Sequence, residues 1–167
     1  SNLYGLANEV TDMQLLKMLT AGCAAALALT ACTTVPEQIQ GDYSEISPAR
    51  VDPSTFGTPV RWGGVIMNAE SRNGKTCFEV LSRRLDKYLR PTQEDYTAGR
   101  YIACKDGFQD PAVFTEGREI TTTGAIRNIE MRELEEFNYR YPVIDVDSLV
   151  LWEKRRNVIV YRGFNDP

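Results

Sequence analysis

Histidine is absent from the sequence. Its absence removes the side chain that most often serves as a general base and the one that most often binds metal. The four cysteines form no CxxC pattern of the zinc-binding kind, and the Ser-x-x-Lys motif of serine nucleophiles does not occur. We therefore expect no metal site, no catalytic residue and no enzymatic activity.

A surplus of positive charge is also lacking, because 19 Lys and Arg face 23 Asp and Glu, a net charge of −4. Nucleic-acid binding needs basic side chains gathered on one face, so we expect no nucleic-acid partner. The same balance gives no support for electrostatic docking to anionic lipid. With 43% hydrophobic residues in 167, the chain can still form the core of one domain with appendages.

No apolar run is long enough to cross a bilayer comfortably, which takes about 20 residues. Residues 18–31 are fourteen uncharged residues that follow Lys17, as in the apolar region of a signal peptide. The run ends in Leu29-Thr30-Ala31-Cys32, which fits the lipobox of bacterial lipoproteins. A buried Ala/Leu core helix is the alternative, but such a helix should carry a polar face. Cys23 is a weaker candidate because no Leu stands at the required place before it.

The lipobox predicts how Cys32 matures. Its thiol accepts diacylglycerol, a peptidase cuts the Ala31–Cys32 bond, and the new amine takes an acyl chain such as palmitate. Two or three acyl chains anchor a protein firmly, since each buried CH₂ contributes about 0.8 kcal/mol. Thr33 follows the cysteine where Asp commonly marks retention in the inner membrane, so we expect the outer membrane, with the domain in the periplasm.

The segments on either side of the signal peptide are interpreted from composition. Residues 1–12 carry Glu9 and Asp12 where positive charge is expected, so we interpret them as an artefact of cloning or of the assigned gene start. Residues 13–31 are then the signal peptide, starting at Met13. Residues 32–58 are polar and rich in proline, which predicts a lipidated, flexible tether. Residues 59–167 form the domain.

Five short strands are predicted in that domain, at 60–69, 76–81, 100–105, 118–126 and 143–152, with a further edge strand at 158–161. Asn73-Gly74 is a hairpin turn signal. Residues 82–99 form a long connection with a helical turn near 85–89, and the glutamates between 126 and 143 form a solvated rim. Glycines at 63, 64 and 124 suit tight bends. We predict an all-β fold, a small five- to six-stranded antiparallel barrel of the OB type, with a two-sheet sandwich as the alternative.

An ordered set of short motifs resembles the Slp family, the starvation-inducible outer-membrane lipoproteins of Gram-negative bacteria. The set is Arg61-Trp62-Gly63-Gly64, Thr76, Glu79, Leu85-Asp86, Arg90-Pro91, Gly99-Arg100, Gly107-Phe108-Gln109-Asp110-Pro111, Gly124, Tyr139-Arg140-Tyr141-Pro142-Val143 and Leu151-Trp152. The resemblance implies an outer-membrane lipoprotein that faces the periplasm and has no assigned enzymatic activity. Cys77 and Cys104 depart from the family pattern.

Those two cysteines lie in neighbouring predicted strands, so a disulfide is a candidate in an oxidising compartment. Two buried free thiols are the alternative, because register cannot be read from sequence.

For the remaining candidate residues we prefer a structural role to a functional one. Asp145 and Asp147 could act as a catalytic or calcium-binding carboxylate pair, but an outward polar face alternating with an apolar one accounts for them. Glu79 is expected to pair with a basic group such as Arg61 or Arg100. Trp62 and Trp152 are expected in the core.

Three functions follow from these observations. The leading one is a non-enzymatic envelope lipoprotein whose barrel, active in envelope maintenance under stress or starvation, contacts an envelope protein or a cell-wall component. The second is a carrier that binds a lipid or a glycan on the barrel. The third is a hydrolase that uses Glu79 or the Asp145–Asp147 pair.

Overall fold

The computed structural model describes residues 34–156. Cys32, the signal peptide, residues 1–12 and the predicted edge strand at 158–161 therefore lie outside the described residues. Within the described range, no helix is long and apolar enough to cross a membrane.

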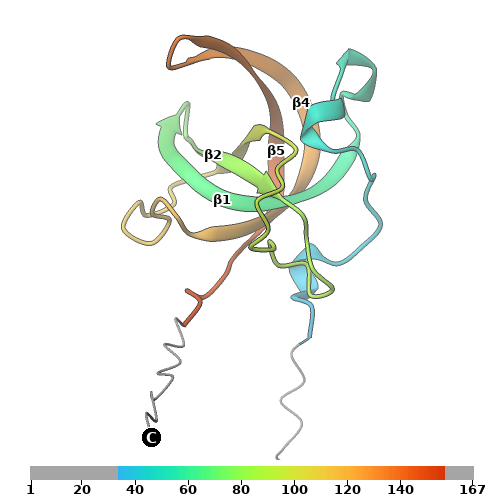
Figure 1. The fold of residues 1–167 in the computed structure, drawn as a ribbon, viewed down its shortest axis with the longest axis vertical. Coiled ribbons are helices and arrows are strands. Elements are labelled where there is room, and N and C mark those ends of the chain that lie inside the picture. The colour runs from blue at the N-terminus through green and yellow to red at the C-terminus, as the bar shows by residue number, and fades with distance from the viewer. Residues whose placement is uncertain (1–33, 157–167) are drawn as a thin grey trace, which may run out of the picture. The chain divides into compact units, whose positions relative to one another are not determined.

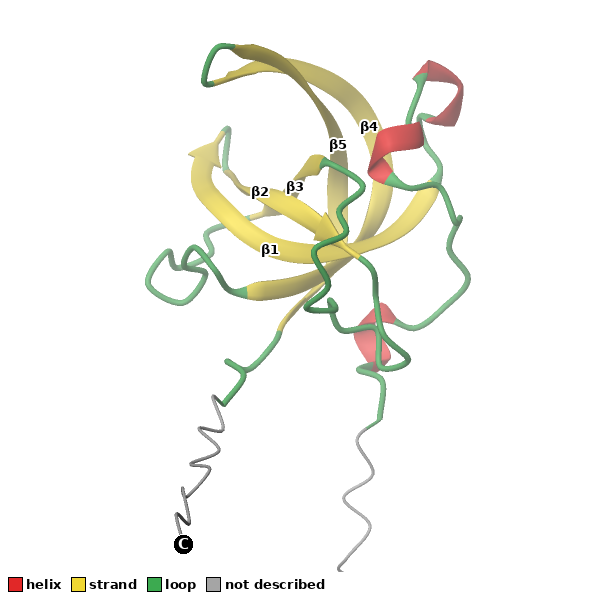
Figure 2. Cartoon of the chain, in the orientation of Figure 1, coloured by secondary structure: helices red, strands yellow, loops and turns green. Residues whose placement is uncertain are grey.

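Five strands form one closed barrel in the order β1-β2-β3-β5-β4 (Figures 1 and 2). Their bounds are β1 Pro59–Arg72, β2 Lys75–Arg83, β3 Arg100–Asp106, β4 Glu119–Leu134 and β5 Phe137–Leu151. All five predicted strands are confirmed, and the all-β barrel is confirmed over the sandwich. All five strands are longer than predicted, most of all β4 and β5, which continue together into a long hairpin.

One pairing departs from the antiparallel expectation, since β3 and β5 run parallel at Ile102↔Val143 and the three following pairs. The odd number of strands in the barrel requires a parallel pair. Five strands cannot alternate in direction around a closed ring, so one neighbouring pair must be parallel. Asn73 and Gly74, with φ of 50° and 77°, form the predicted turn between β1 and β2, as a type I′ hairpin requires.

Glycine permits two close strand crossings. A Cβ at Gly64 would stand 2.0 Å from the carbonyl oxygen of Leu81, and one at Gly124 would stand 1.9 Å from that of Asp145. No other residue fits at these distances, which confirms the predicted tight bends.

The barrel interior is filled by apolar side chains from every strand. Fully buried members include Phe78, Tyr101 and Ile144, and Trp62 belongs to the same cluster. Trp62 donates from Nε1 to the carbonyl of Ile46 at 2.7 Å, which confirms its expected place in the core.

The predicted flexible tether is wrong from Val35 onward, because this segment belongs to the same compact unit as the barrel. It contains three 3-10 turns, η1 Glu37–Ile39, η2 Pro48–Arg50 and η3 Pro53–Thr55. Ile39 and Val51 are almost fully buried, and Arg61 donates to the carbonyls of Ile39 and Gly41 at 3.1 Å. A few apolar anchors therefore fix a segment whose composition is that of a linker.

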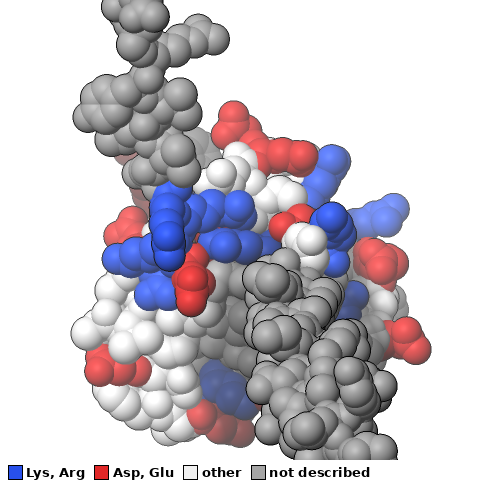
Figure 3. All heavy atoms as spheres, turned by 90° about the horizontal axis from the view of Figure 1, so that it is seen from below, with Lys and Arg blue, Asp and Glu red and all other residues white. Residues whose placement is uncertain are grey.

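The described chain begins and ends at the same end of the barrel, and the β4–β5 hairpin lies at the other end (Figure 1). Seen from the end where the chain begins and ends, Lys and Arg side chains gather in a band (Figure 3). We call this end the base.

Candidate functional site

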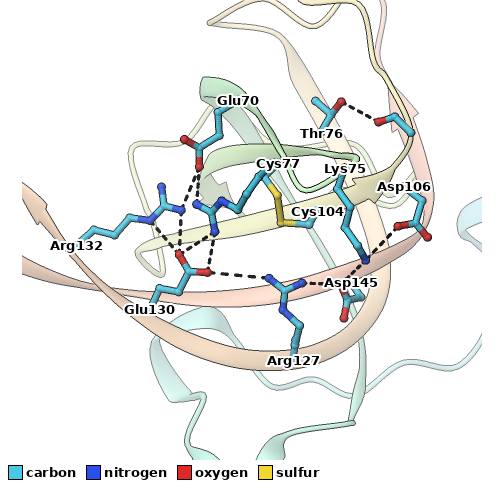
Figure 4. Close-up of a disulfide and its surroundings, with 12 residues drawn as sticks. Glu70, Lys75, Thr76, Cys77, Cys104, Asp106, Arg127, Glu130, Arg132 and Asp145 are labelled. Atoms are coloured by element: carbon cyan, nitrogen blue, oxygen red, sulfur yellow. Dashed lines mark hydrogen bonds and ion pairs between the residues drawn. A yellow bond between two sulfur atoms is a disulfide. The ribbon is translucent and has the colours of Figure 1, made fainter.

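The outer face of β2, β3 and β5 carries an apolar cluster of its own. Cys77 and Cys104 lie opposite each other in the β2–β3 register and are joined by a disulfide. Ile102, Tyr141 and Val143 pack beside them and are almost fully buried. The structure thus brings together the two cysteines whose pairing the sequence left undecided (Figure 4).

Four charged side chains join the β1–β2 hairpin to the β4–β5 hairpin over this face. Arg72 contacts Glu130 at 2.8 Å and Glu70 at 2.5 Å, and Arg132 contacts the same two carboxylates at 2.9 and 3.1 Å (Figure 4). Their side chains are 24% to 41% exposed. Although burial lowers it, hydrogen bonds to Glu130 and Glu70 hold the pKa of Arg72 above its ordinary value. We call these four residues the clamp.

The sequence holds a partial signal for the clamp. Glu70-Ser71-Arg72 and Glu130-Met131-Arg132 are two Glu-x-Arg motifs, and residues two apart in a strand share a face. Pairing between the motifs could not be predicted from that spacing alone, because each strand carries a bulge just before its motif, at Met67 in β1 and at Arg127 in β4. A one-residue shift exchanges the faces of every later side chain.

Asp145 and Asp147 do not form a site together. The Asp145 carboxylate accepts from Lys75 Nζ and Arg127 Nη1, both at 3.0 Å. Asp147 is exposed and occupies a bulge in β5, the extra residue between the partners of Thr123 and Gly124. The predicted outward polar face is confirmed, and the carboxylates offer no shared ligand position for a metal or a reacting water.

Glu79 is paired as the sequence predicted, with Arg100 rather than Arg61. Its Oε1 lies 2.5 Å from Arg100 Nη1 and accepts from the Tyr141 hydroxyl at 3.0 Å. Burial, together with the hydrogen bond to Glu79, raises the pKa of Tyr141. Burial lowers the pKa of Arg100, but the contact with Glu79 outweighs it and the net shift is upward. A carboxylate held in this way has both a cation and a phenol as partners.

Trp152 lies at the base and is partly buried. Its Nε1 donates to Thr121 Oγ1 at 2.9 Å, and the guanidinium of Arg90 lies 5.6 Å from its ring centroid. The expectation that Trp152 lies in the core is therefore wrong, because the residue stands just past the end of β5 and is only partly covered. Among the described residues, no group of three His, Cys, Asp or Glu side chains is close enough to hold a metal ion.

The chain is similar in sequence to several known proteins. The profile of the outer membrane lipoprotein Slp family matches residues 29–166. An uncharacterized lipoprotein of Escherichia coli K12, YeaY, is 29% identical over 147 residues, which cover 85% of this chain and 76% of the relative. An uncharacterized protein of Haemophilus influenzae Rd is 32% identical, with 77% and 73% covered. Outer membrane protein Slp of E. coli K12 is 26% identical, with 78% and 72% covered.

Two solved structures align with this chain at low sequence identity. A small single-stranded DNA-binding protein from Streptomyces coelicolor is 10% identical, with a TM-score of 0.36 over 57% of this chain and 94% of that one. An OBody bound to hen egg-white lysozyme is 11% identical, with a TM-score of 0.41 over 70% of this chain and all of that one.

Proposed function

Because the chain belongs to the outer membrane lipoprotein Slp family, we propose that it is a non-enzymatic lipoprotein anchored through Cys32. The barrel stands in the periplasm and presents its β4–β5 hairpin to a protein of the cell envelope.

The proposed anchor is covalent lipid on Cys32. The family match begins at residue 29 and so includes the whole of Leu29-Thr30-Ala31-Cys32. Diacylglycerol on the thiol and an acyl chain on the amine would supply enough buried CH₂ groups for stable attachment.

The absence of enzymatic activity is proposed from the chemistry of the candidate groups. Glu79 is held by Arg100 and Tyr141, and Asp145 by Lys75 and Arg127. In both places the carboxylate already serves as the partner of a cationic side chain of the barrel. The chain also has no histidine to take their place.

The filled barrel argues against the carrier alternative in which a ligand lies inside. Twelve buried side chains form one cluster in the interior, and interiors packed in this way hold no space for a lipid or a glycan. Binding must therefore use the outer surface.

The observation that carries the proposed partner contact is the β4–β5 hairpin. Beyond Asn128 its two strands pair only with each other, and the clamp fixes them against the β1–β2 hairpin. Met131 and Phe137 are 61% and 71% exposed there. Large apolar side chains on a rigid element far from the anchored end are suited to contact another protein.

Site-specific photo-crosslinking tests this proposal. A photoreactive amino acid replaces Phe137 in cells that make the full chain, during growth and during starvation. The matched control position is Val113, which is 46% exposed in the β3–β4 connection. We expect a discrete protein adduct from position 137 that position 113 does not give. No adduct at 137, or the same adduct at both positions, would contradict the proposed role of the hairpin.

A further inference from the structure

We propose that a groove at the base of the barrel binds the phosphate-bearing headgroup of an anionic lipid in the anchoring membrane. The inference rests on the proposed lipid anchor at Cys32. It adds a ligand at the base of the barrel, the end opposite the β4–β5 hairpin that is proposed to contact a protein.

The groove has a volume of about 480 Å³ and lies between two segments that are distant in sequence. Residues 43–48 form one wall, and residues between 82 and 98, from the end of β2 and the β2–β3 connection, form the other. The start of β1 also lines the groove. Ile46, Leu85 and Leu89 contribute apolar surface to its lining. The walls of the groove are therefore partly polar and partly apolar.

Each wall supports an arginine on a tyrosine. The guanidinium carbon of Arg61 lies 5.0 Å from the Tyr43 ring centroid, and that of Arg84 lies 4.2 Å from the Tyr96 ring centroid. An arginine stacked on an aromatic ring keeps its N–H edge available, and that edge matches the oxygens of a phosphate. Both arginines line the same groove, so the groove offers two such edges to a phosphate group.

The two arginines retain the capacity to bind. The hydrogen bonds of Arg61 to described residues both run through Nη1. Arg84 is 62% exposed, and its contact with Glu94 is long, at 3.9 Å. Acidic groups are also present, since Glu45 and Asp86 line the groove. The Asp86 carboxylate, however, accepts backbone N–H groups of its own loop at 2.8 and 3.0 Å.

The position of the groove favours a lipid over a soluble anion. Ile39 is fully buried and stands seven residues after Cys32, so an extended chain can separate them by at most about 25 Å. Tyr43 follows four residues later. A lipid on Cys32 would therefore hold the groove close to the headgroups of the membrane.

The base also has the charge that such a surface requires. Residues 83–98 and 152–156 hold seven basic and four acidic residues, whereas residues 34–156 as a whole hold 17 and 20. The two segments are joined, since Arg155 donates to the carbonyl of Pro91 and Arg90 to that of Glu153, both at 2.7 Å. Figure 3 shows the resulting basic band. The net charge of the whole chain does not reveal this basic band, because the acidic residues at the other end of the barrel offset it. Those residues include Glu133, Glu135 and Glu136.

Hydrogen exchange of the lipidated full chain in vesicles tests the proposal. The vesicles contain phosphatidylcholine alone or mixed with phosphatidylglycerol, and the variants are Arg84→Gln and the control Arg50→Gln, which alters an exposed arginine of η2. We expect the backbone amides of residues 83–98 to exchange about fivefold more slowly in the anionic vesicles than in the neutral ones. This factor corresponds to roughly 1 kcal/mol, the contribution of one basic residue near an anionic membrane surface. Arg84→Gln should abolish this protection and Arg50→Gln should keep it.

Two results would overturn the proposal. One is equal exchange in both vesicles, or protection that survives Arg84→Gln. The other is the same protection from soluble glycerol phosphate added to neutral vesicles, which would identify a free anion as the ligand. Flotation with the vesicles reports the anchor separately, so a chain that floats without protection refutes the groove alone.

Discussion

Arg72 donates from Nη1 to both carboxylate oxygens of Glu130, at 2.8 and 3.1 Å, across 58 residues of sequence. This contact ties the tip of β1 to the extension of β4 that carries the exposed Met131. The hairpin offered to a partner is thereby held in one position on the disulfide-bonded face, which lowers the entropy that partner binding would otherwise have to remove.

Loss of the clamp should destabilise the protein. Glu130→Gln removes the shared carboxylate of Arg72 and Arg132 and leaves two partly buried guanidinium groups with a weaker partner. We expect the free energy of unfolding to fall by about 1–3 kcal/mol. Urea unfolding followed by tryptophan fluorescence measures it. The control is Glu133→Gln on an exposed residue of the same strand, for which a change under about 0.5 kcal/mol is expected. Equal effects of the two variants would refute the clamp.

The Cys77–Cys104 disulfide closes a loop with a sequence separation of 27. Loop-closure entropy predicts that its loss lowers the free energy of unfolding by about 3–4 kcal/mol. Dithiothreitol should therefore reduce the urea midpoint of the native protein, and it should leave the midpoint of Cys77→Ala/Cys104→Ala unchanged. A native protein whose midpoint does not respond to the reductant would show that the bond contributes nothing to stability.

Gly124→Ala should be severe, because the new Cβ would overlap the backbone of Asp145 and force β4 and β5 apart. We expect a loss of about 3 kcal/mol or more. Gly57→Ala is the comparison, since Gly57 has a φ of 86° but open space around it, and left-handed strain alone costs about 1–2 kcal/mol. Thermal unfolding of both variants checks the order, and a milder effect at Gly124 would contradict the close crossing.

Stability should fall at alkaline pH through the buried tyrosines. Burial raises the pKa of Tyr101, against a smaller opposing effect of its hydrogen bond with Thr122, and the pKa of Tyr141 is raised as well. Above the ordinary tyrosine pKa of about 10, the unfolded chain loses these protons while the folded chain keeps them, so the free energy of unfolding decreases as pH rises.

Urea unfolding between about pH 8 and pH 11 measures this loss. Tyr101→Phe should flatten the decline, and the control Tyr88→Phe, on a side chain that is 36% exposed, should not. A decline that is identical in the two variants and in the native protein would assign the alkaline loss to other groups.

Much of the barrel could be predicted because it depends on local rules. Ile144 and Val146 alternate with Asp145 as a half-buried strand requires, and Asn73-Gly74 permits few turns other than a tight hairpin. The extension of β4 and β5 was missed because its exposed glutamates suggest a rim, although residues on an outer strand face can be charged without ending the strand.

The segment before the barrel could not be predicted from composition. Proline and polar residues dominate it, but Ile39 and Val51 are enough to dock it, and only the folded barrel shows where they fit. The clamp and the basal groove depend likewise on register and on long-range contacts, which bulges at Met67 and Arg127 alter. The periodicity of a sequence cannot predict tertiary pairing of this kind.

Lipid attachment at Cys32 is the central feature of the proposed function. Intact-mass measurement of the protein isolated from native outer membranes tests it directly. We expect a chain that begins at Cys32 and carries the added mass of diacylglycerol and an N-acyl group. A chain that retains residues before Cys32, or one that begins there without lipid, would contradict it.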